Sequence, residues 1–269
     1  MAPIYLGAFS FFMGYTINID KEKCIGCGLC AKDCPTQHFS IEDKKANTNT
    51  SLCIGCGHCF AICPNGAISI PEYDTKDVHD VVPFTNFDSE EFLKAIHSRR
   101  TIRQFQDKEI EKDAIDKIIE AGRFSPTGAN AQDVAFTILG SKQDEIEKAC
   151  VNLFRFGVNT AKPFIKGIRN INIDDKFFFK GSKLVILVSA KSKLNGGLAS
   201  AYMEMMAATL GIGTLYSGFF ETCFSISPKV RGLIKLPKGH ELCSCMVFGY
   251  PKVKYKRTVP RNKANVRQL

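Results

Sequence analysis

Apolar residues recur with two different periods along the last two thirds of the chain. A helical period of three to four residues predicts helices in residues 88–98, 109–121 and 198–210. Short, mostly apolar runs predict buried strands in residues 134–139, 184–190 and 243–248. Because helices and strands alternate here, we expect an α+β sandwich whose central, antiparallel-rich sheet is flanked by helices.

The first third of the chain has a different pattern. Residues 15–72 hold short apolar runs around two nearly identical cysteine-rich segments, which predicts a small module of two strand–loop–helix halves. Residues 73–87 are polar and contain proline, so they predict a linker to a second module in residues 88–269. Residues 1–14 form an apolar leader without a pattern, which we expect to be either not native or disordered.

Composition agrees with two globular modules. The chain has 269 residues, of which 45% are hydrophobic and 23% charged, which excludes wholesale disorder. Residues 1–80 carry 6 basic and 9 acidic side chains, whereas residues 81–269 carry 30 and 18. No apolar run approaches the ~20 residues of a membrane-spanning helix, so we expect no membrane span. We also expect no nucleic-acid partner, since no nucleic-acid-binding motif accompanies the basic charge.

Eight of the twelve cysteines form two tandem runs. The run CIGCGLCAKDCP of residues 24–35 returns as CIGCGHCFAICP in residues 53–64, and both have the C-x2-C-x2-C-x3-C-P spacing that ligates [4Fe–4S] clusters. In such pairs the fourth cysteine of each run completes the other cluster. We therefore assign one cluster to Cys24, Cys27, Cys30 and Cys63, and the second to Cys53, Cys56, Cys59 and Cys34. Zinc is the alternative metal for these cysteines, but two identical runs in tandem favour iron–sulfur clusters.

Residues 15–72 thus resemble the bacterial two-cluster ferredoxins. The resemblance implies a module that passes single electrons and needs a redox partner elsewhere in the chain or outside it. The clusters are sensitive to oxygen, and the first residues lack the pattern of a secretory signal. We therefore expect the cytoplasm of an anaerobic or microaerobic bacterium.

Three segments of the second module carry candidate chemistry. Residues 98–105, SRRTIRQF, place three guanidinium groups beside a hydroxyl and suit a phosphate, although a helix end that favours cations is an equal alternative. Residues 124–132, FSPTGANAQ, form a polar loop whose amides can bind the edge of a heterocycle, although taken alone an ordinary turn is favoured. Residues 210–219, LGIGTLYSGF, lead from a helix into an extended segment whose backbone N–H groups can face a ring.

In this order the three segments resemble the FMN-dependent nitroreductase family. The late segments LPKGHE of residues 236–241, GYP of residues 249–251 and KRTVPR of residues 256–261 extend the likeness to about residues 88–262. The whole chain therefore resembles a ferredoxin–nitroreductase fusion. The resemblance implies an α+β sandwich and a homodimer with FMN at the interface.

The resemblance also implies roles for individual residues. Arg99, Arg100 and Thr101 hold the FMN phosphate and ribityl chain, with Arg103 nearby and with charge added by Lys256, Arg257 and Arg261. Pro126, Thr127 and Asn130 line the isoalloxazine ring from the partner subunit, supported by Gln132. Ser217 and Gly218 present backbone N–H groups to flavin N5. No side chain is assigned as a catalytic acid or base.

The function expected from these features is that of an oxidoreductase. Electrons move between the two clusters and FMN, and the flavin reduces a nitro compound, a quinone or a similar small acceptor. In a variant of this scheme NAD(P)H reduces the flavin and electrons pass outward through the clusters. An external redox carrier is a further expected partner. The alternative is a non-enzymatic electron relay or flavin-binding protein.

Overall fold

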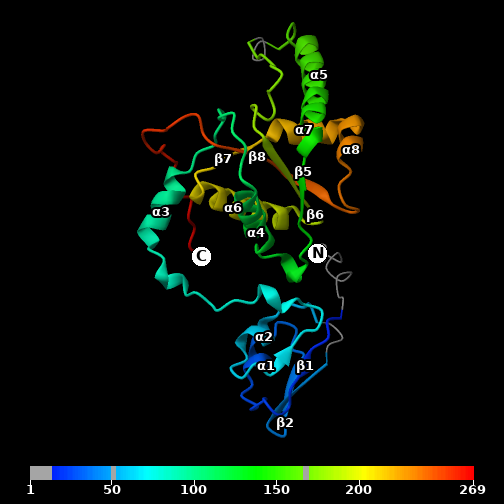
Figure 1. Ribbon diagram of the computed structural model, residues 1–269, viewed down its shortest axis with the longest axis vertical. Coiled ribbons are helices and arrows are strands. Elements are labelled where there is room, and N and C mark those ends of the chain that lie inside the picture. Colours follow the sequence, from blue (N-terminus) through cyan, green and yellow to red (C-terminus); the bar gives the residue numbers. More distant parts are fainter. Residues whose placement is uncertain (1–13, 50–52, 166–169) are drawn as a thin grey trace. The chain divides into compact units, whose positions relative to one another are not determined.

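The computed structural model describes residues 14–49, 53–165 and 170–269 (Figure 1). The expected leader falls almost entirely outside these residues. Contacts divide the chain into two compact units, Met1–Pro83 with Thr127–Gln132, and Phe84–Pro126 with Asp133–Leu269. The division falls between Pro83 and Phe84, inside the expected linker, and it assigns to the first unit a loop that the sequence placed in the second module.

The first unit is built from short elements. Its strands are β1 (Asn18–Ile19), β2 (Phe39–Glu42), β3 (Lys45–Thr48) and β4 (Ile68–Ser69), and its helices are α1 (Leu29–Asp33), α2 (His58–Ile62) and the 3-10 turn η2 (Thr75–Asp77). β1 pairs antiparallel with β4, and β2 with β3. Ile17, Ala46, Ala67, Ile68 and Ile70 form a small core with the buried cysteines.

The two cysteine runs have the same backbone conformation. α1 follows Gly28 at φ 75°, and α2 follows Gly57 at φ 74°. Each helix then ends at an extended cysteine, Cys34 with ψ 112° and Cys63 with ψ 114°. The sequence repeat is therefore also a structural repeat, and its helices begin at glycines because a left-handed backbone strains other residues.

The second unit contains an antiparallel sheet in the order β5-β6-β8-β7. The strands are β5 (Ala135–Ile138), β6 (Leu184–Ala190), β7 (Gly213–Tyr216) and β8 (Glu241–Gly249). The helices are α3 (Ser89–Ser98), α4 (Lys112–Arg123), α5 (Gln143–Ala161), α6 (Lys193–Thr209), α7 (Gly218–Ile226) and α8 (Pro228–Ile234), with 3-10 turns η3 (Phe84–Asn86) and η5 (Gly140–Lys142). The expected α+β sandwich is confirmed, with element ends shifted by a few residues.

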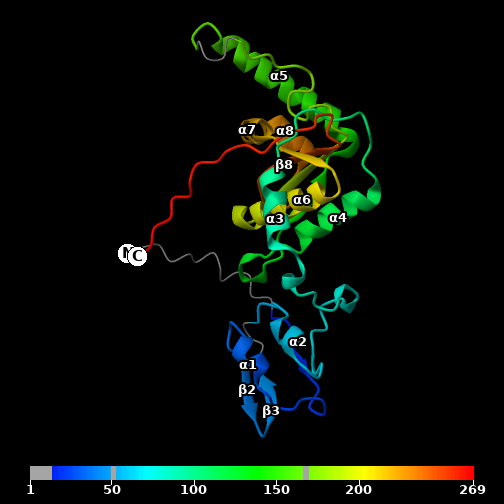
Figure 2. The same cartoon turned by 90° about the vertical axis from the view of Figure 1, so that its left-hand side faces the viewer.

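Alternate residues of β6 face opposite layers of helices. Ile186 and Val188 pack with α4 and α6, whereas Val185 and Leu187 pack with α5, α7 and α8. Figures 1 and 2 show the strands β6 and β8 between these two layers. α4 lies close against its neighbours, because a Cβ at Gly122 would come within 2.9 Å of Met203 and Phe136.

Helix α3 begins as its capping residue predicts but remains uncovered. The Asp88 carboxylate accepts a hydrogen bond from the Glu91 N–H at 2.8 Å. The apolar residues Phe92, Leu93 and Ile96 are 57%, 44% and 43% exposed, and the helix has no buried residue. No helix within the described residues is both long and apolar enough to cross a membrane.

Candidate functional site

Two cavities in the first unit are each lined by four cysteines. One is lined by Cys24, Cys27, Cys30 and Cys63, and the other by Cys34, Cys53, Cys56 and Cys59. Each cavity takes three cysteines from one run and the fourth from the other, which is the grouping that the tandem motif predicts. Among the described residues, no three His, Cys, Asp or Glu side chains converge on a single ion.

The glycines of these runs leave room for the ligand loops. A Cβ at Gly26 would lie 2.2 Å from the carbonyl oxygen of Lys44, and one at Gly55 would lie 2.4 Å from the Tyr15 ring. Backbone N–H groups of Ala46 and Ala67 each lie 3.3 Å from a sulfur, that of Cys24 and of Cys63 respectively. Such N–H donors stabilise negative charge on the sulfur, which is one way a protein tunes a cluster potential.

Burial acts against ionisation of the deeper thiols. It raises the pKa of Cys59 to about 11 and also raises the pKa of Cys30 and Cys53. A buried thiolate needs a positive partner, and cluster iron would supply it. The two four-cysteine cavities therefore fit iron–sulfur clusters in grouping and in chemistry.

The loop Thr127–Gln132 belongs to the first unit through hydrogen bonds to the second cysteine run. The Asn130 side-chain amide donates to the carbonyl oxygens of Gly55 at 2.9 Å and Ile54 at 3.2 Å. It also donates to the Tyr73 hydroxyl at 3.2 Å, as does the Gln132 amide at the same distance. The Tyr73 hydroxyl in turn donates to the Gly55 carbonyl oxygen. Burial raises the pKa of Tyr73 to about 12, so this hydroxyl keeps its proton at neutral pH.

This loop has a strained backbone. Ala129, Asn130 and Gln132 have φ of 51°, 53° and 46°. These values lie in the left-handed region, which residues other than glycine rarely adopt. The 3-10 turn η4 (Gly128–Asn130) lies within it, and the Thr127 hydroxyl accepts a hydrogen bond from the Gln132 N–H at 3.0 Å. Asn130 and Gln132 are thus oriented toward the cluster loop in the single chain, and their expected place against a partner's flavin stays a prediction, as does that of Pro126 and Thr127.

In the second unit a cavity of about 440 Å³ opens where β7 ends and α7 begins; we name it the α7 cavity. Its lining includes Arg103, Phe177, Phe178, Lys180, Ser217 and Gly218. The Ser217 N–H already donates to the Cys245 carbonyl oxygen at 2.8 Å. The N–H of Gly218, at the positive end of α7, has no partner among the described residues. Of the two N–H groups that the sequence proposes for the flavin, only that of Gly218 is thus available.

A second, smaller cavity of about 190 Å³ lies beside the arginine pair; we name it the arginine cavity. Arg99 and Arg100 line it, and Arg99 pairs with the Glu204 carboxylate at 2.8 Å, their side chains being 25% and 13% exposed. The buried hydroxyl of Thr214 lines it and has no hydrogen-bond partner in the part of the chain that the structure describes. An unsatisfied hydroxyl beside two guanidinium groups fits a phosphate or polyol ligand.

The remaining expected flavin residues lie elsewhere. Thr101 forms a β-bridge with Thr214, and its carbonyl oxygen accepts a hydrogen bond from the Tyr255 hydroxyl at 3.4 Å. Lys256, Arg257 and Arg261 are exposed and do not line either cavity. Their expected role at the phosphate stays a prediction.

Sequence reasoning missed four residues of these sites. They are Tyr73, Glu147, Lys180 and Glu204. Tyr73 lay in the expected linker, and no motif accompanies the other three. Tyr73, Glu147 and Glu204 bond to residues far away in the chain, and Lys180 lines the α7 cavity together with residues of β7 and α7. The local pattern gives no sign of these roles.

Comparisons with known proteins agree with both units. The nitroreductase family matches residues 96–250, and the 4Fe-4S dicluster domain matches residues 16–64. A candidate NADH dehydrogenase/NAD(P)H nitroreductase of Archaeoglobus fulgidus is 25% identical over 173 residues, which cover 61% of this chain and 87% of the relative. Ferredoxin-2 of Desulfomicrobium norvegicum is 44% identical over 34 residues, which cover 13% of this chain and 58% of that ferredoxin.

A solved structure shares the fold of the second unit. The nitroreductase with bound FMN from Bacteroides fragilis has a TM-score of 0.53 and 22% identity, and the match covers 66% of this chain and 99% of that chain. The family match spans more than half of the chain and coincides with the sheet and helices that form the α7 cavity. The chain therefore belongs to the nitroreductase family and carries a 4Fe-4S dicluster domain ahead of its nitroreductase domain.

Proposed function

We propose that this protein is an oxidoreductase that moves electrons between two [4Fe–4S] clusters and FMN and reduces a nitro compound, a quinone or a similar small acceptor at the flavin. One observation carries the proposal. A single chain holds two cavities of four cysteines each and, in its nitroreductase domain, a cavity that ends at the Gly218 N–H, which is unpaired within the described residues. Clusters supply single-electron transfer and the flavin supplies two-electron chemistry.

The residues of the α7 cavity and the arginine cavity fit the parts of FMN. Arg100 and the Thr214 hydroxyl suit the phosphate end, because one is a cation and the other a buried hydroxyl that no described residue bonds. Arg103 and Lys180 bring positive charge to the α7 cavity, which favours an electron-rich ring. The Gly218 N–H can donate to a ring acceptor, and Phe177 and Phe178 supply apolar walls.

We further propose a homodimer. The exposed apolar face of α3 supports it, because a short helix needs tertiary packing to be stable in water. The basic residues Lys256, Arg257 and Arg261 would add charge to the phosphate site. NAD(P)H or a reduced carrier protein is the expected donor, and the oxygen sensitivity of the clusters favours an anaerobic or microaerobic cytoplasm.

Anaerobic purification followed by assay of iron, sulfide and flavin per chain tests the cofactors. We expect about eight irons, eight sulfides and one FMN per chain. Reduction of a nitroaromatic or a quinone is then measured with NADPH and with dithionite-reduced ferredoxin. Flavin reduction without turnover of any acceptor would favour the relay alternative, and loss of flavin from a folded, iron-loaded protein would contradict the proposal.

A further inference from the structure

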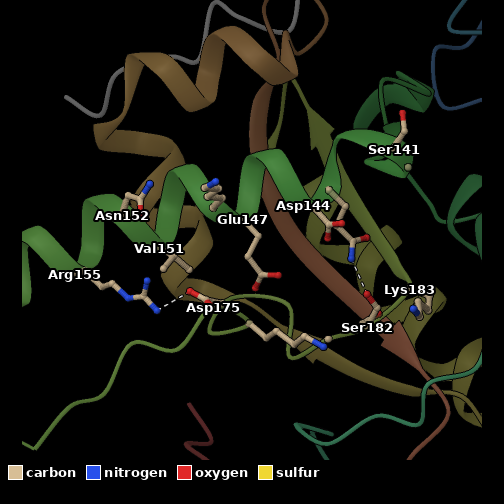
Figure 3. A pocket seen from close by; sticks show the side chains of 14 residues that line it. Ser141, Asp144, Glu147, Val151, Asn152, Arg155, Asp175, Ser182 and Lys183 are labelled. Atoms are coloured by element: carbon tan, nitrogen blue, oxygen red, sulfur yellow. Dashed lines mark hydrogen bonds and ion pairs between the residues drawn. The ribbon is translucent and has the colours of Figure 1, made fainter.

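A buried carboxylate holds one wall of the α7 cavity from behind. Glu147 of α5 is 5% exposed, and its Oε1 accepts hydrogen bonds from the N–H groups of Phe178 at 3.0 Å and Phe179 at 2.8 Å. Figure 3 shows Glu147 projecting from α5 toward the segment that contains these residues. One side chain therefore satisfies two consecutive backbone donors more than thirty residues away in the chain.

Phe178 and Phe179 belong to a turn of residues 175–181, and this turn also forms one wall of the α7 cavity. Phe177, Phe178 and Lys180 line the cavity. The Ser217 hydroxyl donates to the Phe178 carbonyl oxygen at 2.9 Å, directly before the open N–H of Gly218. The peptide groups around Phe178 are thus fixed between Glu147 on one side and Ser217 on the other.

A second cavity lies on the side of the turn that faces α5. A polar cavity of about 670 Å³ separates much of α5 from residues 175–183, and Glu147 lines it together with Asp144 and Lys148. Two further interactions border this cavity. Gln143 donates to the Ser182 carbonyl oxygen at 2.6 Å, and Arg155 pairs with Asp175 at 2.7 Å, a pair that Figure 3 shows. In the middle, Glu147 makes the two bonds that connect α5 with the backbone of the turn.

Burying an ionised carboxylate at position 147 is energetically unfavourable. Burial raises the pKa of Glu147, and the nearby carboxylates of Asp144 and Asp174 raise it further. No cation forms an ion pair with Glu147 among the described residues. An apolar residue would avoid this cost but could not accept the two hydrogen bonds. The bonds to Phe178 and Phe179 are therefore what the carboxylate specifically provides.

We propose that Glu147 is a positioning residue of the flavin site: by fixing the backbone of Phe178 and Phe179 it sets the place of Phe177, Phe178 and Lys180 opposite the N-terminus of α7. This rests on the proposed binding of FMN in the α7 cavity. Glu147 acts through the turn and does not touch the flavin. Its removal should loosen the wall and weaken FMN binding while the clusters remain.

Three variants separate this role from general destabilisation. Glu147→Gln keeps a carbonyl oxygen that can accept both N–H groups, whereas Glu147→Met keeps the approximate length of the side chain without an acceptor. Gln143→Met is the matched control, because it removes a hydrogen bond that α5 donates to Ser182 in the same cavity and keeps both bonds of Glu147 to the N–H groups of Phe178 and Phe179. FMN is titrated into flavin-depleted, iron-loaded protein under anaerobic conditions, and the visible circular dichroism of bound FMN reports the ring environment.

We expect Glu147→Met to raise the Kd for FMN about tenfold and to change the visible circular dichroism. Glu147→Gln and Gln143→Met should stay within about threefold of the parent, with iron content and far-ultraviolet spectra unchanged. Equal Kd values and spectra for Glu147→Met and the parent would overturn the proposal, as would an equal loss in Glu147→Gln. A parent protein that binds no FMN would instead contradict the proposed function.

Should Glu147→Met not fold, Ser217→Ala answers the same question from the other side of the turn. It removes the hydrogen bond to the Phe178 carbonyl oxygen. Because Ser217 also lines the α7 cavity, the result that counts is the coupling between the two changes: since both side chains fix one turn, we expect Ser217→Ala to make FMN binding more sensitive to Glu147→Gln than it is in the parent. Strictly additive effects in this pair would overturn the proposal.

Discussion

The side-chain amide of Asn130 donates a hydrogen bond to the carbonyl oxygen of Gly55 at a distance of 2.9 Å. Gly55 lies between Cys53 and Cys56, which line one of the four-cysteine cavities. Asn130 belongs to a loop that the nitroreductase resemblance assigns to the flavin. Its amide is therefore oriented toward the cluster module, and its backbone is held at a φ of 53°.

Asn130→Ala should make the cluster of the second cysteine run more labile. The change removes donors to two carbonyl oxygens of the ligand loop, at a cost of about 1 kcal/mol for each net hydrogen bond. The measurement is the rate of iron loss to a chelator, together with the intensity of each reduced-cluster signal in electron paramagnetic resonance. We expect one of the two signals to be lost faster than in the parent.

Asn65→Ala is the matched control for this experiment. The Asn65 amide donates to the Lys23 carbonyl oxygen at 3.0 Å, beside the first cysteine run. Asn65→Ala should therefore make the cluster of the first cysteine run more labile and leave the cluster of the second run unchanged. If both variants weaken the same signal, or neither weakens any, Asn130 has no specific role at the second run.

Exchange of fourth ligands gives a direct test of the cluster pairing. Because Cys63 lines a cavity with Cys24, Cys63→Ser and Cys24→Ser should damage the same cluster and leave the same remaining spectrum. Cys34→Ser and Cys53→Ser should leave the other spectrum. A shared spectrum for Cys63→Ser and Cys53→Ser would show that each run binds its own cluster.

The sequence predicts those features of the sites that depend on residues close together in the chain. The cysteine spacing and the glycines before α1 and α2 are local, and together with the repeat they predict a two-cluster module. The apolar run of β6 predicts a central strand because both of its faces are covered by helices.

Interactions between distant residues were not predictable in this way. The residues next to Arg99 in the sequence predict that it binds a phosphate, yet Arg99 pairs with Glu204, which lies 105 positions later. Glu147 is one of several charged residues on α5, and only its contacts with Phe178 and Phe179 distinguish it. The helical period of residues 88–98 predicts α3, but it does not say what covers the apolar face, and within the described chain this face is exposed.

Replacement of Arg99 should lower the stability of the protein, whereas replacement of Arg100 should weaken FMN binding. Arg99→Met leaves the largely buried Glu204 without its partner, so we expect about 1–3 kcal/mol lower stability. The double variant Arg99→Met/Glu204→Met should recover much of it. Arg100→Met should weaken FMN binding about tenfold with little change in melting temperature. Thermal melts and flavin titration check both, and equal melting temperatures for the two single variants would contradict the difference.

Charge placed on the exposed face of α3 should prevent dimer formation. Phe92→Glu/Ile96→Glu replaces apolar side chains that we propose a second copy to cover. We expect sedimentation to show a monomer that retains its iron but binds FMN weakly. Lys94→Gln, on the same helix and already exposed, is the control. A parent protein that sediments as a monomer would contradict the dimer.

Glu147 should make stability depend on pH in a defined direction. Burial raises the pKa of this carboxyl in the folded protein above its ordinary value of 4.5 in the unfolded chain. The folded state then binds the proton more tightly, so stability from this group is present below pH 4.5 and is lost as the pH rises through the folded pKa. Glu147→Gln has no such proton. Flavin-depleted Glu147→Gln should therefore be more stable than the parent at pH 7, with a gap that narrows as the pH falls toward 4.5. Denaturant unfolding at several pH values measures this gap, with Gln143→Met as a reference that should show no such dependence, and a gap that widened toward acid would show that the carboxylate is stabilised in the folded protein.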